Sequence, residues 1–322
     1  MSKKAAETLA ASLEAHSDYR VLRRLDVTRE WPALTGAEVS QAVVLDTETT
    51  GLDPAADKII ELAMVKFEYS RATGEVGRVL GIYDGLEDPG VSIPPESTAV
   101  HGITDEMVRG QRLDESAIEA LLGGVGVVIA HNAGFDRPFV EARLPGFASL
   151  AWGCSLREVP WESVGIGSAK LEYLAYRYGF FFDAHRAEID CRALLEVLRR
   201  SLPGQSDAAF DGGVVPGRVG QQGSAGVTAL KVLLESAREP SLRIWAIGSP
   251  FETKDLLKAR GYRWQADRKV WYRDLEASDR EVELAWLKET VYGGKGAGVE
   301  VETFDARSRY SGREGKIETV RL

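Results

Sequence analysis

Residues 42–52 read AVVLDTETTGL, a short apolar run that ends in two acidic side chains. The run is typical of a buried strand. In an extended chain, residues two apart project to the same face, so Asp46 and Glu48 direct two carboxylates to one point. Neighbouring carboxylates repel each other unless a cation lies between them, and hard oxygen ligands suit Mg²⁺ or Mn²⁺. The stretch therefore predicts a strand that ends in a metal site. For this motif alone, a polar cap on a sheet is the alternative.

The segments after this strand alternate between strand-like and helix-like patterns. Residues 59–69 and 79–83 are rich in β-branched and aromatic side chains, and the turn-like residues 71–74 join them, so we expect an antiparallel pair. Residues 125–130 form a continuous apolar run, which is typical of a buried strand. Helical spacing is found in residues 114–122, 135–143, 171–178 and 187–200. The fold class predicted for residues 41–202 is α/β, with a mixed sheet flanked by helices.

The chain of 322 residues is too long for one ordinary small domain, because one domain takes about 150 residues. Residues 203–226 are rich in Gly, Pro, Ser and Gln and predict a flexible linker. Before this linker we expect a helical N-terminal extension at residues 1–40, followed by the α/β domain. After it we expect a small basic, Trp-containing α/β module at residues 227–292 and a polar C-terminal tail at residues 293–322.

The composition excludes several classes of protein. A net charge of −9 argues against a protein that coats nucleic acid by bulk electrostatics, although a carboxylate site for metal ions adds negative charge of its own. Cys154 and Cys191 lack the spacing of a structural zinc site and fit a reducing compartment. No apolar run reaches the length of about 18 residues that a membrane span needs. We therefore expect a cytoplasmic protein without a membrane partner.

Two further acidic motifs follow the first. Residues 131–136 read HNAGFD and place Asp136 at a strand-to-helix turn, where ligand sites of open α/β sheets form. Residues 185–190 read HRAEID; on one helix His185 and Asp190 would lie about 140° apart, so they converge only if His185 belongs to the preceding loop. A loop histidine that faces a helical carboxylate is suited to act as a general base. A helix N-terminal acid and a surface His and Asp are the alternatives for each motif alone.

Together the three motifs resemble the DEDDh group of DnaQ-like 3′-5′ exonucleases. This ribonuclease-H-like family includes polymerase III epsilon-type proofreading subunits, oligoribonuclease and ribonuclease T. The resemblance covers residues 41–200, and the sequence VHGIT at residues 100–104 supplies a His-Gly-Ile segment that is common in the family. The resemblance implies a ribonuclease-H-like sheet and two Mg²⁺ (or Mn²⁺) ions as cofactors.

The resemblance also implies roles for individual residues. Asp46, Glu48 and Asp190 would hold the first ion, Asp46 and, through water, Asp136 would hold the second, and His185 would act as the general base. The implied substrate-binding residues are Thr49, Thr50, Leu52, His101, Ile103, Asn132 and Phe135. For these residues, packing in the core or capping of a loop is the alternative.

The function that we predict is a metal-dependent 3′-5′ exonuclease. It would hydrolyse terminal phosphodiester bonds of single-stranded DNA, or of frayed 3′ ends, to nucleoside 5′-monophosphates, with a role in proofreading or repair. The predicted partners are single-stranded 3′ ends, with DNA favoured over RNA, and a DNA polymerase or repair complex. An RNA-trimming exoribonuclease and a non-catalytic subunit that binds nucleic acid or a polymerase remain as alternatives. The motifs do not choose between DNA and RNA, because that choice depends on contacts at the 2′-OH. The oligomeric state is left open.

The C-terminal module carries a basic stretch. Residues 254–273 hold seven Lys or Arg side chains against two Asp, and Trp264, Trp271 and Tyr272 lie among them. Basic and aromatic side chains in alternation could follow a phosphate backbone and stack bases. For the Trp side chains we favour the alternative, a small hydrophobic core. The candidate nucleic-acid contacts are Lys254, Lys258, Arg260, Arg263, Lys269 and Arg273.

Overall fold

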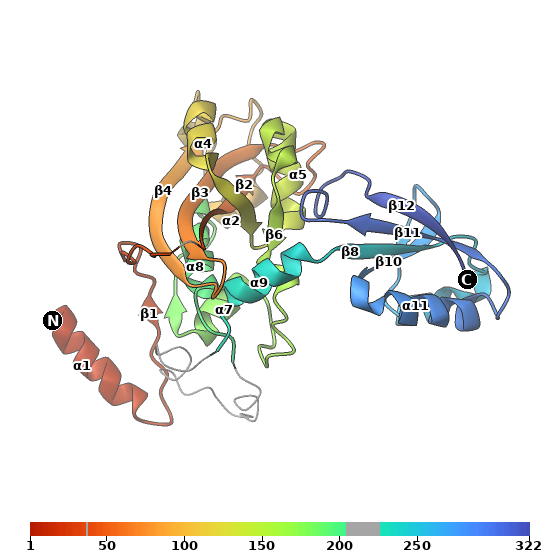
Figure 1. The fold of residues 1–322 in the computed structure, drawn as a ribbon. Helices are drawn as coiled ribbons and strands as arrows, with labels where there is room; N and C mark the ends of the chain where they lie inside the picture. Colours follow the sequence, from red (N-terminus) through yellow and green to blue (C-terminus); the bar gives the residue numbers. More distant parts are fainter. Residues whose placement is uncertain (37, 204–225) are drawn as a thin grey trace. The chain divides into compact units, whose positions relative to one another are not determined.

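The computed structural model describes residues 1–36, 38–203 and 226–322 (Figure 1). The chain divides into two compact units, Met1–Ser236 and Ala237–Leu322. The linker predicted at residues 203–226 lies almost entirely outside the described residues. In the described part of the chain, no helix has both the length and the apolar character that crossing a membrane requires.

The first unit contains a mixed five-stranded sheet with the order β4-β3-β2-β5-β6. The strand β2 is central; it pairs antiparallel with β3 and parallel with β5. The pair β3 and β4 is antiparallel, as the turn between them predicts, and β6 continues the parallel side of the sheet. The strands are β2 (Val39–Thr49), β3 (Ile59–Ser70), β4 (Val76–Leu86), β5 (Val125–Ala130) and β6 (Trp152–Cys154). The predicted mixed α/β fold is thus confirmed.

Helices cover this sheet because each presents an apolar stripe to it. Helix α8 (Ala187–Leu198) packs against β2 and β3, α4 (Glu115–Leu122) against β4, and α5 (Ala133–Arg143) against β5 and β6 (Figure 1). The remaining helical segments of the unit are α2 (Pro95–His101), α3 (Asp105–Val108), α6 (Ser155–Glu158), α7 (Leu171–Arg177), α9 (Ala229–Arg238) and a 3₁₀ turn at Pro145–Ser149.

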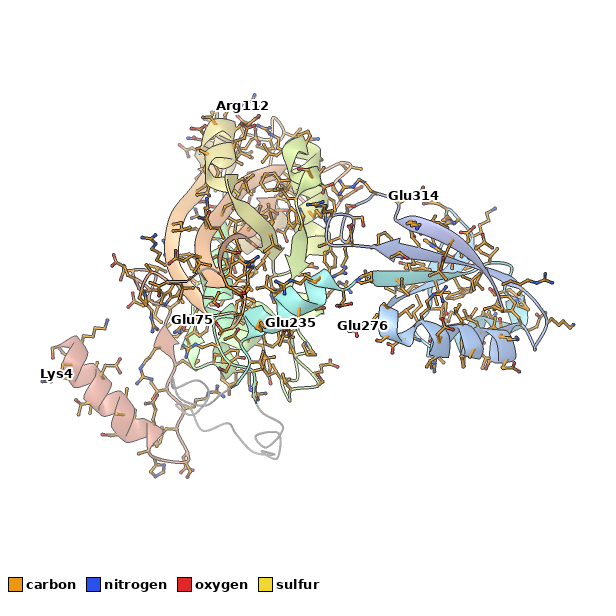
Figure 2. All side chains as sticks on the ribbon, in the orientation of Figure 1. Lys4, Glu75, Arg112, Glu235, Glu276 and Glu314 are labelled. Atoms are coloured by element: carbon orange, nitrogen blue, oxygen red, sulfur yellow. The ribbon has the colours of Figure 1, made fainter. Side chains whose placement is uncertain are left out.

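The N-terminal segment begins with α1 (Lys3–Glu14), which Ser2 caps by accepting the N–H of Ala5. Within this helix, which the structure describes in full, no side chain is buried (Figure 2). A short strand, β1 (Arg23–Arg24), then pairs in parallel with β7 (Phe180–Phe181).

Helix α9 belongs to the first unit. This differs from our expectation, which assigned residues from 227 onward to the C-terminal module. The α9 side chains Leu230 and Leu233 are fully buried in the same hydrophobic core as Val44 and Leu194. Leu233 packs directly over Gly153 of β6, where a Cβ atom would lie 2.7 Å from Leu233 Cδ2. The apolar face of α9 is thus used against the first sheet.

The second unit is built on a five-stranded sheet with the order β12-β11-β8-β10-β9, and every pairing is antiparallel. One face of the sheet is covered by α10 and α11, and the core between them holds Leu242, Ile244, Leu257 and Leu287. The elements are β8 (Ser241–Ala246), α10 (Lys254–Ala259), β9 (Arg263–Gln265), β10 (Val270–Glu276), α11 (Arg280–Trp286), a π-helical turn (Leu287–Val291), β11 (Gly298–Phe304) and β12 (Lys316–Arg321), with 3₁₀ turns at Phe251–Thr253 and Ala277–Asp279.

Residues 293–322 do not form the polar tail that we expected. Strand β11 lies inside the sheet, between β8 and β12. Val299 and Val301 are fully buried against the helices, while Glu300 and Glu302, which alternate with them, occupy the other face. The alternation of apolar and acidic residues over residues 299–304 allows one edge strand at best, whereas the structure places this strand inside the sheet.

Candidate active site

Three carboxylates converge at the end of the central strand β2. One oxygen each from Asp46, Glu48 and Asp190 lies within 4.8 Å of the others, and all three side chains are half-buried. The strand directs Asp46 and Glu48 to one face, and α8 supplies Asp190 from its first turn. The structure thus brings together the first and third motifs, although Glu48 and Asp190 are 142 positions apart in the sequence.

The fourth acid, Asp136, approaches the cluster from the first turn of α5. It is 3% exposed, and its Oδ1 accepts a hydrogen bond of 2.9 Å from Thr47 Oγ1, between the two acids of β2. After burial itself, the charge of Asp136 is the largest cause of the raised pKa of Asp46. Asp136 is therefore part of the same electrostatic site.

His185 lies in the loop immediately before α8. This position allows it to approach Asp190, because two residues five apart within one helix would point in different directions. The side chain is exposed, and the backbone adopts a left-handed conformation with φ of 69°. The next residue, Arg186, donates its N–H to Asp190 Oδ2 at 3.0 Å. This turn keeps the histidine close enough for its charge to lower the pKa of Asp190.

Glu61 is a residue of the site that the sequence analysis did not find. It lies on β3 directly opposite Glu48 and is 1% exposed. Its Oε1 accepts a hydrogen bond of 2.7 Å from Arg186 Nη2, and its Oε2 accepts one of 2.9 Å from the N–H of Ala187. Glu61 thereby anchors the loop that carries His185. The available signal was a lone acid within the apolar residues 59–65.

The electrostatics of the cluster favour bound protons or a bound cation. Burial raises the pKa of Glu48 to about 8, and the charges of Asp190 and Glu61 add to this effect. Burial also raises the pKa of Asp136 to about 7, against the hydrogen bond from Thr47, which lowers it. Burial raises the pKa of Asp190 to about 6, although the N–H groups of Arg186 and His185 lower it. Asp46 is raised well above its ordinary pKa.

The residues fit a divalent cation. Among the described residues, no Lys or Arg forms an ion pair with Asp46, Glu48, Asp136 or Asp190. Carboxylates that repel one another without a cationic side chain between them offer the oxygen ligands that Mg²⁺ and Mn²⁺ prefer. A cation would remove the repulsion that raises the pKa values in the cluster.

The predicted substrate-binding residues fall into two groups. Leu52 is 83% exposed, Asn132 is exposed before α5, and Phe135 is half-buried beside Phe139. The others, Thr49, Thr50, His101 and Ile103, are buried.

The buried group makes contacts within the fold. Thr49 Oγ1 donates to Gly51 O at 2.6 Å, and Thr50 Oγ1 accepts the N–H of Lys58 at 3.0 Å. His101 Nδ1 accepts the N–H of Ile103 at 3.0 Å, across the turn that Gly102 makes with φ of 72°. These side chains therefore shape the backbone around the cluster.

The candidate contacts of the C-terminal unit also divide. Arg260 and Arg273 both pair with buried Glu283, and Arg263 pairs with Asp274. Among the described residues, no acidic side chain pairs with Lys254, Lys258 or Lys269 within 4.0 Å. Three of the six cations are thus engaged within the unit.

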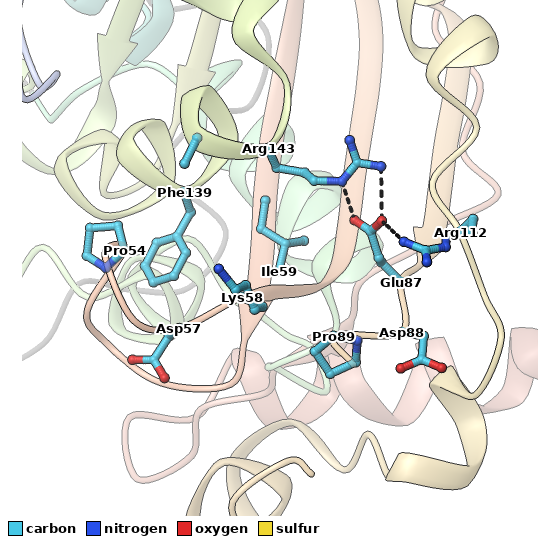
Figure 3. A pocket seen from close by; sticks show the side chains of 11 residues that line it. Pro54, Asp57, Lys58, Ile59, Glu87, Asp88, Pro89, Arg112, Phe139 and Arg143 are labelled. Carbon is cyan, nitrogen blue, oxygen red and sulfur yellow. Dashed lines mark hydrogen bonds and ion pairs between the residues drawn. The ribbon is translucent and has the colours of Figure 1, made fainter. Parts of the chain in front are cut away.

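A pocket of about 210 Å³ lies beside the turn that follows β2 (Figure 3). Its wall includes Phe139 of α5 and Glu87, which accepts two hydrogen bonds from Arg143 at 2.8 and 2.9 Å and faces Arg112. The other lining residues are Pro54, Asp57, Lys58, Ile59, Asp88, Pro89 and Ala142. None of these described residues belongs to the acidic cluster, so the pocket is separate from it.

Carboxylates gathered near a histidine at the end of the central strand of a mixed sheet are suited to a class of enzymes, those that use divalent cations to cleave phosphodiester bonds. Comparison with known families agrees, because the model of the exonuclease family RNase_T matches residues 43–198. The DNA polymerase III subunit epsilon of Treponema pallidum is 33% identical over 162 residues, which cover 47% of this chain and 72% of that protein. The chain therefore belongs to the exonuclease family, whose members are phosphodiester hydrolases.

Other relatives share only part of their length with this chain. The PolC-type DNA polymerase III of Thermotoga maritima is 31% identical over 169 residues, 49% of this chain and 12% of that protein. The chain thus matches about an eighth of such polymerases. Among solved structures, exonuclease X in complex with 5′ overhanging duplex DNA matches 48% of this chain and 88% of its own, with 25% identity and a TM-score of 0.36.

Proposed function

We propose that the protein is a metal-dependent 3′-5′ exonuclease that acts on single-stranded DNA or frayed 3′ ends and releases nucleoside 5′-monophosphates. The observation that carries this proposal is the convergence of Asp46, Glu48 and Asp190 within 4.8 Å, at the foot of the loop that bears His185. Family membership supports the class of reaction.

The four acids would hold two Mg²⁺ or Mn²⁺ ions, with Asp46 shared between them. When bound, such ions supply positive charge that activates water and stabilises the leaving oxygen. Asp136 is fixed by Thr47, and Asp190 by the N–H of Arg186, so both carboxylates are oriented before any ligand binds. Preorganised ligands cost little reorganisation during the reaction.

His185 would act as the general base. It accepts a proton from the water that attacks the terminal phosphorus, and the bond from that phosphorus to the 3′ oxygen of the preceding nucleotide breaks. The negative charge of Asp190 stabilises the imidazolium that forms. Glu61 positions this base through Arg186 and Ala187.

A DNA substrate is favoured by the names of the relatives. The proteins of Treponema pallidum and Thermotoga maritima are a DNA polymerase subunit and a DNA polymerase. By the same reasoning, a DNA polymerase or repair complex is the partner that we propose. An exoribonuclease of the same family is the alternative.

The test is a time course on matched 5′-labelled DNA and RNA strands with Mg²⁺, Mn²⁺ or EDTA. Stepwise shortening that needs metal and is lost in Asp190→Asn is expected, with DNA cleaved faster than RNA. Glu119→Gln, an exposed acid of α4, is the matched control and should keep the wild-type rate. Faster cleavage of RNA would favour the exoribonuclease. Metal-independent cleavage, or full activity of Asp190→Asn, would refute the site.

A further inference from the structure

The second unit carries a continuous row of aromatic and lysine side chains, which we call the aromatic-lysine strip: Phe251, Lys254, Lys258, Trp271 and Trp264. Lys254 Nζ lies 4.1 Å from the centre of the Phe251 ring, and Lys258 Nζ lies 5.9 Å from that of Trp271. Trp271 meets Trp264 edge to face with ring centres 5.4 Å apart. Because residues four apart share one face of a helix, Lys254 and Lys258 connect the two ends of the row.

The ends of the strip are exposed aromatic rings. Phe251 is 75% exposed, and Trp264, on the edge strand β9, is 50% exposed. The core role that we favoured for the Trp side chains therefore applies to Trp271, which packs against the hydrophobic core, and not to Trp264. The strip thus has an exposed ring at each end and two lysines between them.

The charge of the strip points to a polyanion. Among the described residues, neither Lys254 nor Lys258 has an acidic partner within 4.0 Å. The nearby Arg260 and Arg273 share one acidic partner, Glu283. Two lysines without acidic partners among the described residues thus lie between aromatic rings, in a protein with a net charge of −9.

We propose that the aromatic-lysine strip binds single-stranded nucleic acid, with bases stacked on Trp264 and Phe251 and phosphates bound by Lys254 and Lys258. Single strands present both unpaired base faces and phosphates, whereas a duplex keeps its base faces stacked inside. The consequence for catalysis rests on the proposed exonuclease function. A nucleic-acid strand bound by the strip is tethered to the chain that carries the acidic cluster, which raises its effective concentration at that cluster.

The test measures binding by the full-length protein in EDTA, where cleavage is prevented, using the fluorescence anisotropy of labelled oligothymidylate. Trp264→Ala should weaken binding about 5-fold to 100-fold, as expected for one lost stacking contact, while Trp264→Phe should retain most of the affinity. The double variant Lys254→Gln/Lys258→Gln should reduce the salt slope of log K by about 1.4, since each single-strand phosphate contact contributes about 0.7. Blunt duplex DNA should compete poorly.

Arg280→Gln is the matched control, because Arg280 lies outside the strip, pairs with both Glu281 and Glu318, and should contribute little to binding. Near-ultraviolet circular dichroism of each variant verifies that the unit is folded. Unchanged affinity in Trp264→Ala together with an unchanged salt slope in the lysine variant would overturn the proposal in favour of a protein partner on this surface. Because binding is measured without metal, its result is independent of whether the protein cleaves DNA.

Discussion

Binding of Mg²⁺ to the acidic cluster should release protons at neutral pH. With pKa values of about 8 for Glu48, 7 for Asp136 and 6 for Asp190, these groups are about nine-tenths, one half and one-tenth protonated at pH 7. These three groups hold about 1.5 protons, and the raised pKa of Asp46 adds to that number, so the metal-free cluster holds at least one to two protons, shared among its members. A carboxylate must be ionised to bind a metal, so these protons must leave.

The release can be measured by isothermal titration calorimetry of EDTA-treated protein with Mg²⁺. Titrations at pH 7 in HEPES and in Tris separate the heat of proton release, because the two buffers have different ionisation enthalpies. We expect roughly one to two protons per cluster. The association constant for Mg²⁺ should therefore rise roughly tenfold or more for each pH unit between 6 and 8.

The variant Glu48→Gln removes the acid with a pKa of about 8 and should reduce the release by about one proton at pH 7. Glu119→Gln, outside the cluster, should leave the release unchanged. Mg²⁺ binding that releases no protons at pH 7, with equal affinity at pH 6 and pH 8, would refute the reasoning about the cluster.

Three further predictions concern the cluster, the histidine loop and the second unit. In EDTA the melting temperature of the wild type should fall relative to that of Asp46→Asn as pH rises from about 4 to 8, because acids with a raised folded pKa bind more protons when folded than when unfolded. Glu61→Gln should lower kcat by roughly 10-fold to 100-fold with little change in KM, measured by steady-state cleavage, because the His185 loop loses its anchor. Val301→Ala should cost roughly 2 kcal/mol of unfolding free energy in urea denaturation, since β11 is a core strand.

Each of these predictions has a control and a contradicting result. Equal pH slopes for the wild type and Asp46→Asn would mean that the cluster does not govern stability. Arg186→Gln should reproduce the effect of Glu61→Gln, and a wild-type kcat in both variants would exclude a positioning role for the pair. Glu318 on β12 is exposed, so Glu318→Ala should change the free energy of unfolding by less than about 0.5 kcal/mol. An equally small effect of Val301→Ala would mean that residues 293–322 do not stabilise the second unit.

Much of the first unit could be predicted from local pattern. The apolar run of β2 with acids two residues apart, the antiparallel pair β3 and β4, and the strand-to-turn position of Asp136 are set by residues within a few positions of one another. The place of His185 in a loop follows from helical geometry alone, because five residues on a helix turn it away from Asp190.

Contacts between distant segments were decided only by the tertiary structure. Glu61 and Arg186 are 125 residues apart, and nothing in the local pattern of either pairs them. The charges of the second unit show the same limit. Only the fold reveals that Arg260 and Arg273 share Glu283, whereas Lys254 and Lys258 have no acidic partner among the described residues.

The sequence by itself determined which segments are strands and helices around the acidic cluster, because side-chain periodicity and turn chemistry act over a few residues. The structure alone decided which sheet each apolar face covers. Helix α9 follows the predicted linker in sequence yet packs in the first core, and β11 enters the second sheet from a polar segment. Hydrophobic burial is non-directional, so an apolar stripe predicts that a face is buried without indicating its partner.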